Sequence, residues 1–141
     1  MEQKGDTVND DETKIGKKLV HEELTKQILG AAIEVHRELG PGLLESVYET
    51  ALCHELRLRN IPVQQQIAVP LYYKGVDLKC GFRVDIMVRD IVVLELKSVA
   101  NVLPVHEAQL LTYMRLLKKP LGFILNFNVP VLKHGIVRRV L

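Results

Sequence analysis

The hydrophobic period of this chain changes near Pro62 from that of helices to that of strands. Upstream of Pro62, apolar residues recur every three or four positions in two runs, and Gly40-Pro41 separates the runs. Downstream, apolar residues alternate with polar ones or form short continuous runs between turn residues. The pattern predicts a hairpin of two helices followed by a strand-rich part. The residues expected to face inward on the two helices are Leu24, Ile28, Ala31, Ala32, Val35 and Leu39, then Leu44, Val47, Tyr48, Ala51, Leu52 and Leu56.

Turn residues divide the strand-rich part into elements. Lys74-Gly75 and Arg89-Asp90 are typical of tight turns, Gly81 suggests a bulge in a long strand, and Pro104 suits the first turn of a helix. The expected order is ααβββαββ, which predicts an α/β fold class of the α+β type, with a mixed β-sheet flanked by helices. The expected elements after the helix hairpin are strands 63–73, 76–88 and 91–97, a helix to about Lys118, and strands 121–127 and 136–141.

Length and composition fit a single domain. The chain has 141 residues, of which 48% are hydrophobic and 26% charged, so an ordinary core can form without disulfides. Residues 1–18 contain few large apolar groups and are predicted to be a disordered N-terminal arm, which leaves 19–141 as the domain. No apolar run approaches the roughly 20 residues that cross a bilayer, and the two cysteines form no CxxC pair. We therefore expect a cytoplasmic protein without a membrane partner.

The net charge of +2 identifies no partner, but its distribution is uneven. From Pro104 onward there are six basic residues and one acidic residue, Glu107. This distribution permits an anionic partner, although on the charges alone the favoured explanation is that lysines gather at helix ends and in solvated tails. The candidate nucleic-acid-binding residues in this part are Lys118, Lys119, Arg138 and Arg139.

Two charged residues interrupt the apolar strand 91–97, and one interrupts the strand before it. Glu95 and Lys97 are two residues apart and share a face, and Asp85 stands among apolar residues in the same way. A two-residue turn would pair Asp85 with Leu94 and send the two acids to opposite faces, whereas one extra residue pairs Asp85 with Glu95. We predict the second register, because two carboxylates beside a lysine make a site for Mg²⁺ or Mn²⁺. The alternative is an ion pair of Lys97 with either acid at a sheet edge.

The spacing of Asp85 and Glu95-Leu96-Lys97 resembles that of the PD-(D/E)XK nuclease superfamily, with Val84 in place of the proline. In addition, the segment Gly42-Leu43-Leu44-Glu45-Ser46-Val47-Tyr48 resembles the signature of the GxxExxY family within that superfamily. The resemblance implies a restriction-endonuclease-like fold and a metal-dependent nuclease that hydrolyses phosphodiester bonds of nucleic acid, with DNA the expected substrate.

The resemblance also implies roles for individual residues. Asp85 and Glu95 would bind Mg²⁺ or Mn²⁺, and the main-chain carbonyl of Leu96 could add a ligand. Lys97 would position the attacking water. Glu45 would join the metal site directly or through water, although an acid in the first turn of a helix is also explained by the helix dipole.

The helix after strand 91–97 contributes a third group of polar residues. His106, Gln109 and Tyr113 share one face by their spacing, and Gln109 to Tyr113 resembles the QxxxY element of exonuclease-type members of the superfamily. We expect Gln109 near the site, with Tyr113, His106 and the core residue Tyr48 in support. A half-buried helix face with a hydrogen-bonded glutamine is the alternative.

The cysteines, histidines and tyrosines bear on other cofactors and on other modes of binding. Cys53 and Cys80 are too few for an iron-sulfur cluster, and the histidines lack zinc-ligand spacing, so we expect neither. Tyr72 and Tyr73 alternate across a strand, so at most one should face nucleic acid. One site cuts one strand, so duplex scission would require a homodimer or two binding events. The alternatives to a nuclease are a catalytically inactive module of the same fold, binding nucleic acid or a protein partner, and a hydrolase of another phosphate ester.

Overall fold

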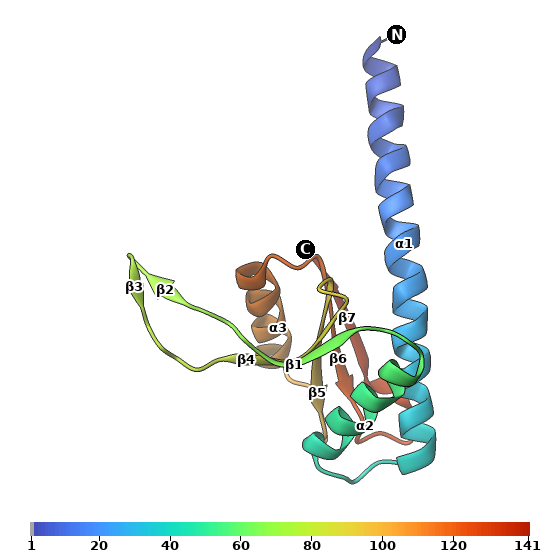
Figure 1. Cartoon of the computed structure of the whole chain (residues 1–141), viewed down its shortest axis with the longest axis vertical. Coiled ribbons are helices and arrows are strands. Elements are labelled where there is room, and N and C mark those ends of the chain that lie inside the picture. The colour runs from blue at the N-terminus through green and yellow to red at the C-terminus, as the bar shows by residue number, and fades with distance from the viewer. Residues whose placement is uncertain (1) are drawn as a thin grey trace.

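A computed structural model describes the backbone of residues 2–141 and the side chains of residues 21–141. Over these residues the chain forms three α-helices, a five-stranded mixed sheet and a separate two-stranded ribbon (Figure 1). The predicted mixed sheet flanked by helices is therefore confirmed. The elements are α1 (Glu2–Leu39), α2 (Glu45–Leu58), β1 (Val63–Ala68), β2 (Tyr72–Tyr73), β3 (Val76–Asp77), β4 (Arg83–Val88), β5 (Val92–Lys97), α3 (Pro104–Leu117), β6 (Leu121–Asn126), the 3₁₀ turn η1 (Leu132–Gly135) and β7 (Ile136–Val140).

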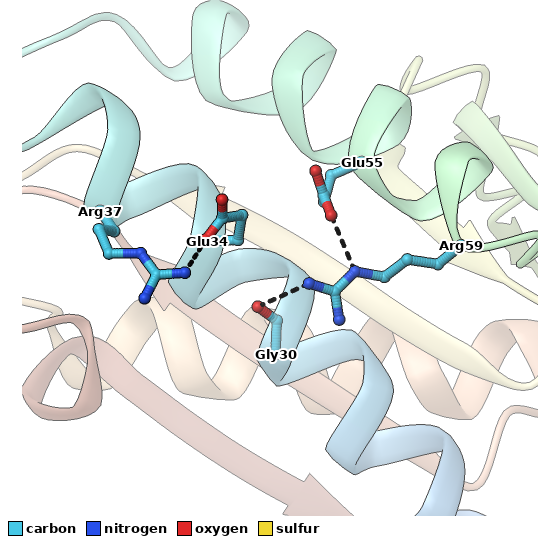
Figure 2. A network of polar contacts seen from close by, with 5 residues as sticks. All are labelled: Gly30, Glu34, Arg37, Glu55 and Arg59. Carbon is cyan, nitrogen blue, oxygen red and sulfur yellow. Dashed lines mark hydrogen bonds and ion pairs between the residues drawn. The ribbon is translucent and has the colours of Figure 1, made fainter.

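The helices α1 and α2 form the predicted hairpin. Gly40, with a φ of 69°, ends α1, because an ordinary L residue rarely adopts this left-handed conformation. At the other end of the hairpin, Arg59 Nε donates to Glu55 (2.9 Å) and its guanidinium donates to the Gly30 carbonyl of α1 (3.5 Å; Figure 2). Figure 2 also shows the ion pair of Arg37 with Glu34 on α1. The side chains of the predicted N-terminal segment, residues 1–18, lie outside the described ones, and the disorder of this segment stays a prediction.

The sheet has the strand order β1-β4-β5-β6-β7, so β5 lies at its centre. The pair β5 and β6 is parallel and the other neighbours are antiparallel. The helices α1 and α2 cover one face, where Ile28, Leu52 and Phe123 belong to a single buried cluster. The helix α3 covers the other face with a smaller cluster that includes Leu110 and Met114. The covering of the sheet on both faces explains why residues 92–96 are all buried.

The two long strands expected before β5 are interrupted. The predicted turn at Lys74-Gly75 is confirmed, because Tyr73 pairs with Val76 and both turn residues have positive φ. However, Pro70 cannot donate a ladder hydrogen bond, and Gly81 has a φ of 72°. The regular pairing of β1 with β4 is therefore interrupted before the hairpin of β2 and β3 begins. The predicted strands 63–73 and 76–88 are therefore each two short strands. The predicted bulge at Gly81 is a break between β3 and β4.

The predicted inward-facing residues are correct along most of the hairpin but wrong at its tip. Leu39 and Val47 are exposed, and Leu44 is 74% exposed. The reason is that Tyr48 is fully buried and hydrogen-bonds to the loop between the helices, so it occupies the space beneath that loop.

As for membrane insertion, none of the helices in the described part of the chain has both the length and the apolar character to cross a bilayer.

Candidate active site

The hairpin of β4 and β5 has the register that the sequence analysis predicts. Ile86 pairs with Leu94 and Val88 with Val92, so Asp85 lies opposite Glu95. Arg89 and Asp90 both adopt positive φ, at 50° and 56°, and the Ile91 N–H closes the turn on the Val88 carbonyl at 2.9 Å. Ile91 is the additional residue that puts both carboxylates on one face.

Beyond the pair of Ile86 and Leu94, side chains replace the main-chain ladder. The Asp85 backbone N–H donates to Glu95 Oε1 at 3.1 Å, and the Leu96 backbone N–H donates to Asp85 Oδ2 at 2.8 Å. Each carboxylate therefore accepts a hydrogen bond from a backbone N–H of the opposite strand. The two reciprocal bonds hold the carboxylates side by side where the strands β4 and β5 separate.

Burial and mutual repulsion perturb both carboxyl groups. Burial is the main reason that the pKa of Glu95 rises to about 8, and the charges of Asp85 and Glu45 add to the rise. The hydrogen bond from Asp85 and the charge of Lys97 oppose it. Burial also raises the pKa of Asp85, with the charges of Glu49 and Glu45 acting in the same direction. Negative charge is therefore destabilised at this site, and a bound cation would relieve that cost.

Lys97 ends the central strand β5 and is half-buried beside Glu95. It forms no ion pair with any residue whose side chain is described, and it does not lie at a sheet edge, so the expected alternative of an edge ion pair is wrong. In the parallel neighbour β6 its partner is Asn126. The buried Asn126 side chain accepts from the Val99 N–H and donates to the Val99 carbonyl, which fixes the chain directly after Lys97.

The segment that resembles the GxxExxY signature packs against the end of β5. The Ser98 N–H donates to Glu45 Oε2 at 3.4 Å, and the Ser98 hydroxyl donates to the Leu43 carbonyl at 2.7 Å. Tyr48 donates to the Gly40 carbonyl at 2.5 Å and accepts from the Leu43 N–H at 3.2 Å. Tyr48 thus closes the loop, and Glu45 lies close enough to affect both site carboxyls.

Glu49 and Gln66 belong to the same site, although the sequence analysis did not identify them. Gln66 lies opposite Asp85 on β1, and its side-chain amide donates to both oxygens of Glu49, at 2.9 and 3.1 Å, and to Asp85 Oδ1 at 3.5 Å. Its φ of 54° is unusual for a residue other than glycine. Glu49 follows Glu45 by one helical turn, a spacing that could have identified it.

On α3, Gln109 and Tyr113 contact each other, and their place in the site stays a prediction. Gln109 Nε2 donates to Tyr113 Oη at 2.9 Å. Burial raises the pKa of Tyr113, and the charges of Glu95 and Asp85 raise it further. His106 has another role, since its Nδ1 accepts from the Leu103 N–H at 3.0 Å and caps the start of α3.

The four predicted nucleic-acid-binding residues lie at the other end of the sheet. The carboxylates lie where β5 ends, whereas Lys118 and Lys119 follow α3 and precede β6. Arg138 and Arg139 pair with the first half of β6. Lys119 forms an ion pair with Asp90 (2.8 Å), Arg138 with Glu22 (2.9 Å) and Arg139 with Glu107. The geometry therefore gives no support for DNA contacts by these residues beside the site.

The oxygen donors of the site suit a hard cation. Across the described side chains, no three His, Cys, Asp or Glu residues form a ready-made metal cluster. Mg²⁺ does not require one, because it is commonly held by one or two carboxylates together with waters and substrate phosphates. The pair Asp85 and Glu95, with Glu45 nearby, fits that pattern, and a cation would offset the burial and the repulsion by Asp85 that raise the pKa of Glu95.

Comparison with known proteins agrees with this geometry. The family model described as the PD-(D/E)XK nuclease superfamily matches residues 22–140, and the chain belongs to that superfamily. Members generally use divalent metal ions such as Mg²⁺, and the fold is consistent with the restriction-endonuclease-like architecture that the sequence predicts. No curated protein and no solved structure matches the chain.

Proposed function

We propose that the protein is a Mg²⁺- or Mn²⁺-dependent nuclease that hydrolyses phosphodiester bonds of DNA. Asp85 and Glu95 would hold the cation, with the Leu96 carbonyl and Glu45 as further oxygen ligands. The observation that carries the proposal is the pair of reciprocal hydrogen bonds that places the Asp85 and Glu95 carboxylates together beside Lys97. A divalent cation supplies Lewis-acid polarisation of the phosphodiester and neutralises the charge that develops there.

The remaining roles belong to residues of the chain. The ammonium group of Lys97 would donate to the attacking water or to a phosphate oxygen, because no described residue pairs with it. Gln109 would hold the Tyr113 hydroxyl in place beside the carboxylates. Tyr48 would fix the loop that presents Glu45, which supports assigning the chain to the GxxExxY branch of the superfamily. A single site cuts one strand, so we expect nicking by a monomer and duplex scission only by a homodimer or through two binding events.

The proposal is tested by cleavage of single-stranded, duplex and branched DNA and of RNA with Mn²⁺ or Mg²⁺. We expect wild-type protein to cleave DNA and Lys97→Ala to lose at least about 10²-fold in rate while still binding DNA. Lys118→Ala, on the other end of the sheet, is the matched control and should cleave at the wild-type rate. Binding without cleavage of any of these substrates by wild-type protein would contradict the proposal and favour the inactive module.

A further inference from the structure

Between β1 and β4 the chain leaves the sheet as a narrow ribbon, which we call the arm and define as residues 69–83. Its two sides are joined by the pairs of β2 and β3 and by hydrogen bonds from Leu78 N–H to the Leu71 carbonyl and from Val69 N–H to the Phe82 carbonyl. Figure 1 shows β2 and β3 at the far end of this ribbon, well away from the helices and the sheet. Beyond Val69, which is buried at its base, the arm is therefore a two-stranded projection with solvent on both faces.

The surface of the arm combines apolar and basic groups. The expectation that at most one of Tyr72 and Tyr73 faces nucleic acid stays a prediction, because successive side chains of a strand point to opposite faces. Both rings are nevertheless exposed, at 63% and 61%. The reason is that a ribbon outside the sheet has no buried face. Val76, Leu78 and Phe82 are exposed as well. Exposed apolar groups in such number mark an interaction surface or an aggregation risk.

The charge of the arm indicates the kind of partner. Lys74, Lys79 and Arg83 are exposed, and Asp77 is the only acid in residues 69–83. The Lys74 ammonium lies 5.3 Å from the centre of the Tyr73 ring. Basic groups interleaved with aromatic rings match a polyanion that also offers flat apolar surface, which describes nucleic acid.

The base of the arm is attached to the candidate active site. Arg83 Nη1 donates to the Gln66 carbonyl at 3.0 Å, and the Gln66 side chain reaches Asp85. The Phe82 ring lies 5.8 Å from the ring of Tyr113, whose hydroxyl accepts from Gln109 on α3. The base of the arm therefore adjoins the site, and a ligand held along the arm would extend toward Asp85 and Glu95.

We propose that the arm is the element that holds duplex DNA against the site formed by Asp85 and Glu95. This inference rests on the proposed nuclease function for its substrate, although DNA binding by the arm does not require cleavage. The major groove of B-form DNA admits a two-stranded β-ribbon, whereas the major groove of A-form RNA is too narrow and deep. The shape of the arm therefore favours duplex DNA over duplex RNA.

The test measures DNA binding in the presence of a chelator, so that no cleavage occurs. The variant Lys74→Glu/Lys79→Glu is compared with Lys118→Glu/Arg138→Glu, which has the same change in charge at the other end of the sheet. We expect the arm variant to bind DNA at least about tenfold more weakly. The plot of log K for binding against log salt concentration should become shallower, with the magnitude of its negative slope reduced by about 2. We expect the control to bind within about twofold of wild type.

Two further measurements separate the apolar from the charged contribution. Tyr72→Ser/Tyr73→Ser should weaken binding with an unchanged salt slope, because no phosphate contact is lost. Duplex DNA should also slow alkylation of the exposed Cys80 thiol, with the buried Cys53 as the unreactive internal reference. Duplex RNA of the same sequence should give weaker protection.

Several results would overturn the inference. They are equal loss of affinity in the control variant, wild-type affinity in both arm variants, or tighter binding of duplex RNA than of duplex DNA. A fourth is an arm variant that turns a dimer into a monomer without weakening DNA binding, which would make a second copy of the chain the partner. If wild-type protein binds DNA through the arm but does not cleave it, only the proposed nuclease activity is contradicted. If wild-type protein cleaves DNA but the arm variants bind DNA with wild-type affinity, only the proposed role of the arm is contradicted.

Discussion

Glu95 is the residue on which the pH behaviour of the protein depends most. Its carboxyl ionises near its ordinary value of 4.5 in the unfolded chain, but near 8 in the folded protein, chiefly because of burial. Between these two values the unfolded chain binds fewer protons than the folded protein, so the free energy of unfolding must fall as pH rises. Above about pH 8 both states are ionised and the loss is complete.

The variant Glu95→Gln should remove this loss of stability. A glutamine keeps an oxygen that can accept the Asp85 N–H and carries no charge, so we expect the metal-free variant to be more stable than wild type at pH 8, by roughly a few kcal/mol. It should nevertheless lose metal-dependent cleavage. Urea denaturation at pH 5 and pH 8 measures the effect, with the exposed Glu23→Gln as control. Equal stability losses from pH 5 to pH 8 in Glu95→Gln and wild type would show that Glu95 is not the group responsible.

Gln66 is expected to act on Asp85 without touching substrate. Its amide lowers the pKa of the Asp85 carboxyl against the larger effect of burial, so its removal should disfavour the ionised ligand. The variant Gln66→Gly also removes backbone strain, because the left-handed φ of this position costs any residue type other than glycine about 1 kcal/mol. We therefore expect wild-type or higher stability but Mn²⁺ binding that requires a higher pH, measured by calorimetry. Asn60→Gly, with a φ of 60° at the end of α2, is the control for strain alone. An unchanged pH dependence in Gln66→Gly would refute this positioning role.

At the scale of elements, Tyr48 joins the helix hairpin to the sheet. Its ring stacks on Phe127 with the centroids 4.4 Å apart, and its hydroxyl bonds to two backbone groups of the loop after α1. The loop in turn carries the Leu43 carbonyl that accepts from Ser98 at the end of β5. Tyr48 therefore stabilises the fold and also determines where Glu45 lies.

Tyr48→Phe separates the hydrogen bonds from the stacking. The variant keeps the ring but leaves the Gly40 carbonyl and the Leu43 N–H without their partner, so we expect a loss of about 1–3 kcal/mol in the free energy of unfolding. Tyr48→Ala should lose about 3–5 kcal/mol because it also empties the core. Chemical denaturation measures both, and the exposed Tyr72→Phe should change stability by less than about 0.5 kcal/mol. Wild-type stability of Tyr48→Phe would mean that the loop does not depend on this residue.

At the scale of the whole molecule, the sequence predicts what depends on local periodicity and on chemical necessity. The helices, the turns and the order of strands follow from period and from turn residues. The register of β4 and β5 was predictable because only one register brings Asp85 and Glu95 together. Both kinds of inference use residues that are close in sequence or are related by one hairpin.

The rest depends on packing between distant elements, which leaves no spacing in the sequence. Gln66 meets Glu49 because β1 packs under α2, and Lys119 meets Asp90 across 29 positions. Three of the four candidate nucleic-acid-binding residues, Lys119, Arg138 and Arg139, therefore look available in the sequence but form ion pairs in the structure. The arm was not foreseen as a projection, because Pro70 and Gly81 each interrupt a strand that otherwise has continuous strand propensity.

The most direct test of the nuclease proposal is anomalous diffraction from crystals soaked in Mn²⁺. Wild-type crystals should show one strong peak between the carboxylates of Asp85 and Glu95, at a pH above 8 where Glu95 is ionised. The peak should be absent in Asp85→Ala crystals that are otherwise unchanged. Absence of a peak between these carboxylates at millimolar Mn²⁺, or an identical peak in the variant, would contradict the metal-dependent mechanism.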